Sequence, residues 1–517
     1  MLHAAWLGFM SLWAPMSIAM MVIGVVVGFV FGATPGLGGN MYLAVLLPFV
    51  YKLSPPAAFA LLLGGHSAIT FGGAASAILI NTPGTGDCIS TTWDGYPLSQ
   101  QGHAGRAIGA ASTASALGGL FGVAVLIVVI PLVSRIISAF GPPEMLSMAL
   151  VGIAMVGFIS QGSLSKGLIA GGLGLLLSFI GTDPITGETR FTFGSLFLQD
   201  GLDFAVAIIG LFGIAGVLDL LISGRKSVAE TDVPSSGDST LSGIGDVLRN
   251  WRLLLQSSSL GALLGPIPGV GGSITNVMAY ALAQRTSKVG HLFGTGRIEG
   301  VIAPQSADNS KEAGAIIPTV ALGIPGSSAM AIFLGAFYIL GLQPGPQMLT
   351  THADITFSLV WILAVANVLT GILALAAGGQ LVRITRMRTA YLATVVLVIA
   401  FVGAYSLTNS FDSVIAALAF GVVGVVMKRY GFSRPALLIG LLLGSTAETN
   451  FMVSYHVWGL AFLLRPITVI ILLAGIAGLT YPTLKSAGGR LVGAARRSLG
   501  ATRAVGATEG SDDGGSP

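Results

Sequence analysis

The sequence predicts an all-α polytopic membrane protein with about twelve transmembrane segments in two repeats, whose helices are broken or re-entrant at Pro-Gly motifs. Of the 517 residues, 53% are hydrophobic and only 9% are charged, and the mean hydropathy is +0.85. A soluble domain carries about 25% charged residues, because it must present a solvated surface. This composition therefore excludes a soluble enzyme, and long charge-free runs and repeated Pro-Gly pairs refine the prediction.

Runs without Asp, Glu, Lys or Arg mark the expected spans, since a membrane-spanning helix needs about 20 mostly apolar residues. The long runs are Met1–Tyr51, Leu53–Gly86, Ala107–Ser134, Leu253–Gln284, Ala313–Ala353, Ile355–Val382, Thr389–Phe411 and Pro466–Leu484. Shorter ones are Met145–Ser165, Ser413–Met427, Pro435–Ala447 and Thr449–Leu464, and Phe204–Ile222 adds a further span. The first run has no basic segment before it and is too long for a signal peptide, so we expect it to stay in the membrane.

Composition divides the chain into four regions. Residues 1–222 and 251–484 are the expected N-terminal and C-terminal transmembrane repeats, residues 223–250 a polar linker, and residues 485–517 a disordered basic tail. Basic residues flank the membrane ends of both polar regions, so the positive-inside rule places the linker and the C-terminus in the cytoplasm. The alternative is that these charges only keep the loops soluble.

Two glycine-rich elements recur in the two halves. Gly32-Ala-Thr-Pro-Gly-Leu-Gly-Gly39 matches Gly265-Pro-Ile-Pro-Gly-Val-Gly-Gly272, and Asn81-Thr-Pro-Gly-Thr-Gly86 matches Gly323-Ile-Pro-Gly-Ser-Ser328. A duplicated unit with a linker between its copies explains this order, whereas chance similarity among Gly-rich segments is the alternative. Inverted topology is our expectation for the two copies, as in many secondary transporters.

These Pro-Gly elements are expected to unwind the chain at membrane depth, because proline lacks an N–H group and glycine tolerates strained backbone. Such backbone is tolerated only inside protein or around a water-filled cavity. The N–H groups that open the next half-helix attract anions. The predicted substrate-binding residues are Pro35, Gly36, Gly38, Gly39, Asn40, Asn81, Thr82, Pro83, Gly84, Thr85, Pro268, Gly269, Gly271, Gly272, Ser273, Asn276, Pro325, Gly326, Ser327 and Ser328. The alternative is that the prolines only kink continuous helices.

Polar residues near the breaks are candidates for coupling transport to Na⁺ or H⁺, since intramembrane polar groups tend to be functional. They are Asp87, Thr91, Asp94, Gln305, Asp308 and Asn309. We expect no cofactor and no metal site, because the single Cys88 excludes a cysteine-based one. No phosphate-binding loop follows Gly294-Thr-Gly296, so an ion gradient is the expected energy source.

Several longer strings resemble the TctA family, the large integral membrane subunit of the tripartite tricarboxylate transporters. The most distinctive is Gly72-Gly-Ala-Ala-Ser-Ala-Ile-Leu-Ile-Asn-Thr-Pro-Gly-Thr85, followed by Asp94-Gly-Tyr-Pro-Leu98. Gly181-Thr-Asp183, Arg190-Phe-Thr-Phe-Gly194 and Phe293-Gly-Thr-Gly-Arg-Ile-Glu-Gly-Val301 are also similar to the family. One departure is that Gln305 stands where the family often has Glu.

This resemblance implies secondary active uptake of citrate-like or other small carboxylates across a bacterial inner membrane, by symport with an ion. It also implies two partners, namely a small four-span membrane subunit and a periplasmic solute-binding protein. The departure at Gln305 bears on the coupling ion or the substrate charge.

Two other functions remain open from the residues. A passive anion channel would use the same polar cavity without coupling to an ion gradient. An intramembrane aspartyl protease is suggested by the GxGD string Gly84-Thr-Gly-Asp87, but it needs a second carboxylate on another helix. Asp183 is the candidate for that carboxylate, and it lies in a segment that reads as a loop.

Overall fold

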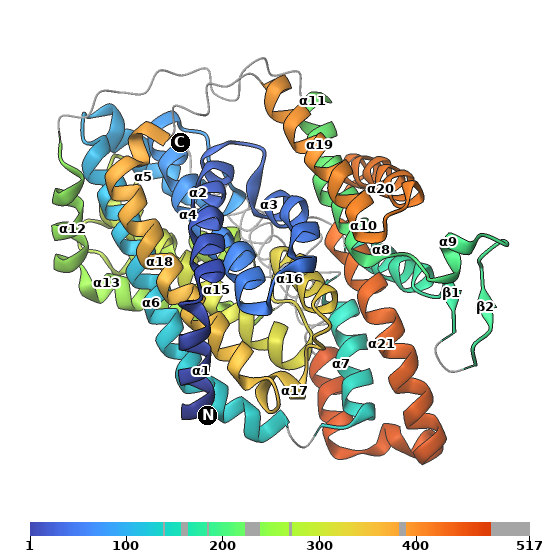
Figure 1. Ribbon diagram of the computed structural model, residues 1–517. Helices are drawn as coiled ribbons and strands as arrows, with labels where there is room; N and C mark the ends of the chain where they lie inside the picture. The colour runs from blue at the N-terminus through green and yellow to red at the C-terminus, as the bar shows by residue number, and fades with distance from the viewer. Residues whose placement is uncertain are drawn as a thin grey trace, which may run out of the picture.

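The computed structural model describes residues 1–137, 140–156, 164–183, 186–222, 238–267, 271–381 and 389–476. These residues are almost entirely helical (Figure 1), which confirms the all-α class. Strands occur in the described part only as a short antiparallel hairpin, β1 (Gly181–Thr182) with β2 (Thr189–Arg190). In Figure 1 this hairpin projects away from the helices.

The helices of the first half follow one another with few long connections. They are α1 (Leu2–Leu12), α2 (Pro15–Ala33), α3 (Gly38–Leu46), α4 (Pro55–Ile80), α5 (Ile89–Gln100), α6 (Ala104–Ile137), α7 (Pro142–Val156), α8 (Leu164–Leu177), α9 (Leu196–Gln199), α10 (Phe204–Ile208) and α11 (Ala215–Ile222). The 3₁₀ turns η1 (Leu47–Lys52) and η2 (Gly86–Cys88) precede α4 and α5, and the π-turn η4 (Ile209–Ile214) joins α10 to α11.

The second half has a similar series of helices. They are α12 (Thr240–Arg249), α13 (Trp251–Leu264), α14 (Gly271–Thr286), α15 (Glu299–Leu322), α16 (Ser328–Ile339), α17 (Pro346–Leu349), α18 (Ala353–Leu381), α19 (Thr389–Thr408), α20 (Phe411–Arg429) and α21 (Arg434–Trp458). Two 3₁₀ turns, η5 (Gly290–Leu292) and η7 (Gly459–Leu464), and a last apolar helix, Pro466–Ile476, complete its described part.

Seven helical segments of the described chain are long and apolar enough to cross a bilayer. They are Pro15–Ala33, Pro55–Ile80, Ala104–Ile137, Phe204–Ile222, Ala353–Ala376, Phe411–Arg429 and Arg434–Leu464. Shorter apolar helices, such as Leu164–Leu177 and Ser328–Ile339, accompany them. The chain is therefore a multi-pass membrane protein, while the number of twelve spans stays a prediction.

Two buried helices, α4 and α15, form the centre of the structure (Figure 1). Helix α4 packs against α2 and α18, and α15 packs against α6 and α13. Glycine allows the closest of these approaches, since a Cβ added at Gly28 of α2 would overlap the backbone of Gly65 in α4. Such contacts between small residues are typical of helix pairs in membranes.

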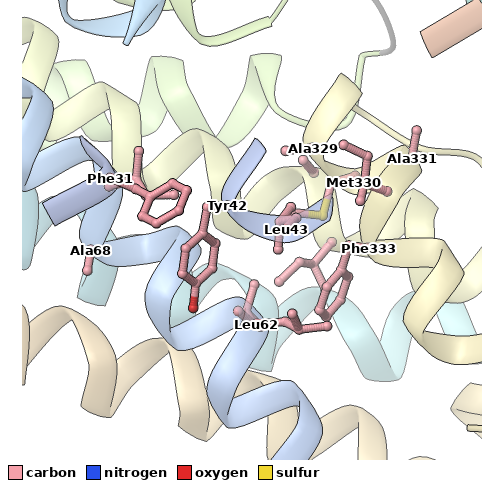
Figure 2. Packing of buried hydrophobic residues seen from close by; sticks show 14 of the residues in the cluster. Phe31, Tyr42, Leu43, Leu62, Ala68, Ala329, Met330, Ala331 and Phe333 are labelled. Carbon is pink, nitrogen blue, oxygen red and sulfur yellow. The ribbon is translucent and has the colours of Figure 1, made fainter. Parts of the chain in front are cut away.

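The half-helices α3 and α16 meet over α4 in an apolar cluster. Figure 2 shows Leu43 of α3 close to Met330 and Phe333 of α16, and Tyr42 of α3 beside Phe31 of α2, with Leu62 of α4 below them in the view. The hydroxyl of Tyr42 donates a hydrogen bond of 2.6 Å to the carbonyl oxygen of Leu61. This cluster fixes the positions at which the two half-helices begin.

The predicted C-terminal tail, residues 485–517, lies wholly outside the described residues, and the predicted linker, residues 223–250, lies partly outside them. Its last part forms α12, which packs against α6. The guanidinium of Arg106 in α6 binds both carboxylate oxygens of Asp246 in α12, at 2.6 and 3.0 Å. The end of the linker is therefore held on the helical body.

Candidate functional site

The helices end at the Pro-Gly elements instead of bending through them. Helix α2 ends at Ala33 and α3 begins at Gly38, while α4 ends at Ile80 before Asn81, whose φ is 51°. Helix α15 likewise ends before Gly323, whose φ is 68°, and α16 begins at Ser328. Helix α13 ends at Leu264 and α14 begins at Gly271, and the predicted site residues Pro268 and Gly269 lie outside the described residues.

All four interruptions border one cavity of about 740 Å³. Its wall includes segments of α3, α4, η2, α14, α15 and α16. The lining residues are Gly36, Leu37, Gly38, Gly39, Asn40, His66, Ile69, Thr70, Pro83, Gly84, Thr85, Gly86, Asp87, Gly271, Gly272, Ser273, Ile274, Lys311, Glu312, Gly326, Ser327, Ser328 and Ala329. A volume of this size accommodates a small organic ligand.

Three helices, α3, α14 and α16, begin at the cavity wall. Their first residues, Gly38, Gly271 and Ser328, all line it. The first N–H groups of a helix lack partners within the helix, and they carry the positive end of its dipole. Three such ends around one cavity create a region that favours an anion.

Hydrogen bonds join the breaks of the first half crosswise to those of the second. The amide of Asn40 in α3 donates to Ser328 Oγ in α16 over 3.0 Å. Ser273 Oγ in α14 donates to Asp87 Oδ1 over 3.0 Å, and Asn276 Nδ2 donates to the Asp87 carbonyl oxygen over 2.8 Å. The cavity is therefore bounded by segments that are far apart in the sequence.

A chain of charged side chains crosses one wall. Lys311 Nζ lies 2.5 Å from Glu312 Oε1 and 3.8 Å from Asp87 Oδ2, and Glu312 Oε2 lies 3.3 Å from His66 Nε2. Lys311 and Glu312 are almost completely buried, whereas the side chain of Asp87 is 32% exposed. Lys311 thus brings a positive charge to the wall, with Asp87 as its more distant and more open partner.

Behind that wall, the amide side chains of α15 are fully engaged with neighbouring helices. Gln305 Nε2 donates to Thr91 Oγ1 over 2.7 Å, and Gln305 Oε1 accepts from Ser115 Oγ over 2.8 Å. Asn309 Oδ1 accepts from Thr70 Oγ1 over 2.6 Å, and its Nδ2 donates to Asn367 Oδ1. These contacts hold α15 between α4, α5, α6 and α18.

Asp94, another predicted ion-coupling residue, holds a loop. Its Oδ1 accepts from the backbone N–H groups of Gly294, Gly296 and Arg297 at 2.7–2.9 Å, and its Oδ2 accepts from the hydroxyl of Tyr280. The carboxylate is completely buried, so these four donors compensate its charge. Asp94 therefore fastens α5 to the loop before α15, away from the cavity wall.

The structure brings most of the predicted substrate-binding residues together. Those that line the cavity are Gly36, Gly38, Gly39, Asn40, Pro83, Gly84, Thr85, Gly271, Gly272, Ser273, Gly326, Ser327 and Ser328, together with the ion candidate Asp87. Those off the lining are Pro35, Asn81, Thr82, Asn276 and Pro325, and the ion candidates Thr91, Asp94, Gln305, Asp308 and Asn309. Asp183 also lies off it and pairs with Arg190 at 3.4 Å.

Comparison with known proteins identifies the family. The model described as "Tripartite tricarboxylate transporter TctA family" matches residues 18–439. The chain belongs to the TctA family. It is 31% identical over 483 residues to an uncharacterized 52.8 kDa protein in the TAR-I ttuC' 3' region of Agrobacterium vitis, covering 93% of this chain and 96% of that protein. An uncharacterized protein in the TAR-II ttuC' 3' region of the same organism is 33% identical over 190 residues, which is 37% of this chain and 78% of that protein.

No solved structure matches the chain. Membership of the TctA family confirms the resemblance noted in the sequence, and it identifies a component of a transporter of the tripartite tricarboxylate type.

Of the charged groups at the wall of this TctA-family cavity, the sequence predicted only Asp87. His66, Lys311 and Glu312 are not among the predicted site residues, although all three line the wall. The signal was present, because two adjacent charges lie directly before the apolar run Ala313–Ala353. They marked the boundary of a span in the sequence, whereas the structure places them within the buried helix α15.

Proposed function

We propose that this protein performs secondary active uptake of small carboxylates, citrate-like tricarboxylates or related di- and monocarboxylates, driven by a gradient of Na⁺ or H⁺. The carboxylate binds in the cavity between the helix breaks. The protein acts as the large membrane subunit of a tripartite transporter in a bacterial inner membrane. Its linker and C-terminus lie in the cytoplasm.

The observation that carries this proposal is the convergence of three helix N-termini and Lys311 on one cavity. Backbone N–H groups and an ammonium group are complementary to a carboxylate, and helix N-termini of this kind receive anionic substrate groups in other transporters. The hydroxyl of Ser327 at the same wall adds a neutral donor.

Ion coupling is supported by the charge of the wall. Asp87 and Glu312 offer two carboxylates against the single ammonium group of Lys311. A substrate anion adds further negative charge, which a low-dielectric site disfavours unless a cation enters with it. Binding of the cation makes binding of the substrate favourable, and this couples transport of the cation to transport of the substrate.

The partners in this proposal are a small four-span membrane subunit and a periplasmic solute-binding protein. Family membership supports them, because the family is one of tripartite transporters. The binding protein captures the carboxylate and delivers it to the cavity. One half of the membrane subunit then moves against the other and opens the cavity to the cytoplasm.

The test is uptake of labelled citrate, succinate and acetate into proteoliposomes that contain this chain and the four-span subunit. Each assay is run with and without the binding protein, and with a Na⁺ gradient, a pH gradient or neither. We expect accumulation above the external concentration only with a gradient and the binding protein. Equilibration that never exceeds the external concentration would instead identify a passive channel.

A further inference from the structure

We propose that Asp308 is the residue that binds and releases a proton during transport. This inference rests on the proposed function, because it names the coupling ion and its site. Asp308 lies in α15, three residues before Lys311, and its side chain is completely buried.

Asp308 differs from the other acidic residues near the cavity in having no donor. No hydrogen bond from a described residue reaches either of its carboxylate oxygens. Asp94, which is equally buried, accepts four. A buried ionised carboxylate without donors is strongly disfavoured, so the position is suited to a carboxyl group that carries a proton.

The amide of Asn276 faces Asp308 from α14. Its Nδ2 donates one hydrogen to the Asp87 carbonyl oxygen over 2.8 Å. An amide nitrogen carries two hydrogens, so the second one is available to the Asp308 carboxylate once its proton has left. Asn276 therefore assists release of the proton, whereas burial and the neighbouring carboxylates favour its binding.

The groups that face Asp308 come from three elements. Asp87 and Cys88 belong to η2, Lys311 and Glu312 belong to α15, and Asn276 belongs to α14. His66 of α4 reaches this group through its 3.3 Å contact with Glu312. Three carboxylates therefore share the ammonium group of Lys311, which pairs with Glu312 and Asp87. A proton on Asp308 removes the one negative charge that has no partner.

This arrangement couples the proton to the substrate through Lys311. While Asp308 is ionised, the wall is too negative to attract a carboxylate. Protonation of Asp308 leaves Lys311 free to exchange its distant partner Asp87 for the substrate. Release of the substrate on the other side restores the negative wall, and the proton then leaves. The proton and the substrate must therefore cross the membrane together.

The experiment compares Asp308→Asn with the parent protein in the assembled transporter, using labelled citrate and succinate in Na⁺-free proteoliposomes. A gradient of about one pH unit drives about tenfold accumulation when one proton accompanies the substrate, because one unit is a factor of ten in equilibrium. We expect Asp308→Asn to lose this accumulation, while counterflow against preloaded substrate remains measurable. Asn276→Ala should reach half-maximal uptake at a higher external pH, because the ionised carboxylate has lost the amide donor that favours it.

The matched control is Asp412→Asn, the same change at an exposed position at the start of α20, which should accumulate substrate like the parent. Proton-driven accumulation that persists in Asp308→Asn would overturn the inference. So would a parent protein that responds to a Na⁺ gradient and ignores the pH gradient, since the unpartnered oxygens would then serve Na⁺. A parent protein without accumulation or counterflow would instead refute the proposed function itself, together with this inference.

Discussion

In the proposed function, Lys311 contributes both to stability and to substrate binding. Its ammonium group is almost completely buried, close to Glu312 and farther from Asp87. A buried charge is tolerated only when it is paired, so Glu312 is needed to hold Lys311 in the folded protein. The longer contact with the partly exposed Asp87 is the one that a substrate carboxylate can replace.

Separate variants distinguish the two roles of Lys311. Lys311→Gln leaves the buried Glu312 without its ammonium partner and with only the 3.3 Å contact to His66, so we expect the free energy of unfolding to fall by about 3–5 kcal/mol and uptake to be lost. In Lys311→Gln/Glu312→Gln both charges are gone, so the melting temperature in detergent should recover most of the loss. Uptake of labelled citrate should remain absent in the double variant. Restored uptake there would mean that Lys311 only neutralises Glu312.

At the scale of residues, the sequence predicted the neutral lining of the cavity and one of its charges, Asp87, but not Lys311 or Glu312. Glycines, serines and Asn40 beside the Pro-Gly pairs were found because proline and glycine stop helices wherever they occur. The coupling role of Asp94 stays a prediction, and the structure adds that its carboxylate holds the loop before α15. These contacts are with residues 200 positions or more away, which no local pattern contains.

At the scale of elements, the breaks are also close packing contacts. A Cβ added at Gly84 would overlap the carbonyl oxygen of Gly32, which lies at the end of α2. A Cβ added at Gly326 would lie 2.8 Å from the carbonyl oxygen of Gly265, which follows α13. In each half, the second break therefore packs against the end of the helix that precedes the first break.

Alanine substitutions measure this packing. We expect Gly84→Ala to lower the free energy of unfolding by about 3 kcal/mol, because the backbone must move to admit the methyl group. Gly326→Ala should cost about 1 kcal/mol, since its clash is milder. The control is Gly172→Ala in α8, where the added Cβ has no neighbour within 4 Å, and we expect no loss. Equal melting temperatures for all three variants would contradict the tight packing at Gly84.

The sequence also predicted where several helices end, but it did not predict every short helix. The interruptions at Pro35, Pro83 and Pro325 lie where the sequence placed them. Helix α12 was not expected, because residues 223–250 are polar and rich in turn-forming residues. The ten residues of α12 nevertheless form a helix that packs against α6. Hydropathy alone does not divide long runs into half-helices either, since both half-helices and full spans are uniformly apolar.

At the scale of the whole molecule, hydrogen bonds join the four helix breaks in a symmetric pattern. The first break of the first half contacts the second break of the second half through Asn40 and Ser328. The second break of the first half contacts the first break of the second half through Asp87 and Ser273. Aligning the two halves at the second break of each places α4 opposite α15, and both are buried at the centre. This pattern is what duplication predicts, and it supports movement of one half against the other.

The two halves differ where the charges lie. In the same alignment, His66, Ile69 and Thr70 of α4 occupy the places of Asp308, Lys311 and Glu312 of α15. Charged residues therefore concentrate on the wall that α15 supplies, and α4 supplies a mostly neutral one. In the proposed function, a carboxylate at Lys311 is therefore held by the second half, and α3 of the first half lies at the same cavity.

A disulfide between the half-helices α3 and α16 tests whether the halves must move. In a Cys88→Ala background, Asn40→Cys and Ser328→Cys place thiols at side chains that now share a hydrogen bond of 3.0 Å. We expect oxidation to join them, measured as loss of maleimide labelling, and to reduce uptake about tenfold, with recovery after reduction. Each single cysteine variant should be insensitive to the oxidant. Full uptake by the disulfide-linked protein would contradict the need for α3 and α16 to separate. The two half-helices would then move as one body, and the cavity would open at the contact between η2 and α14.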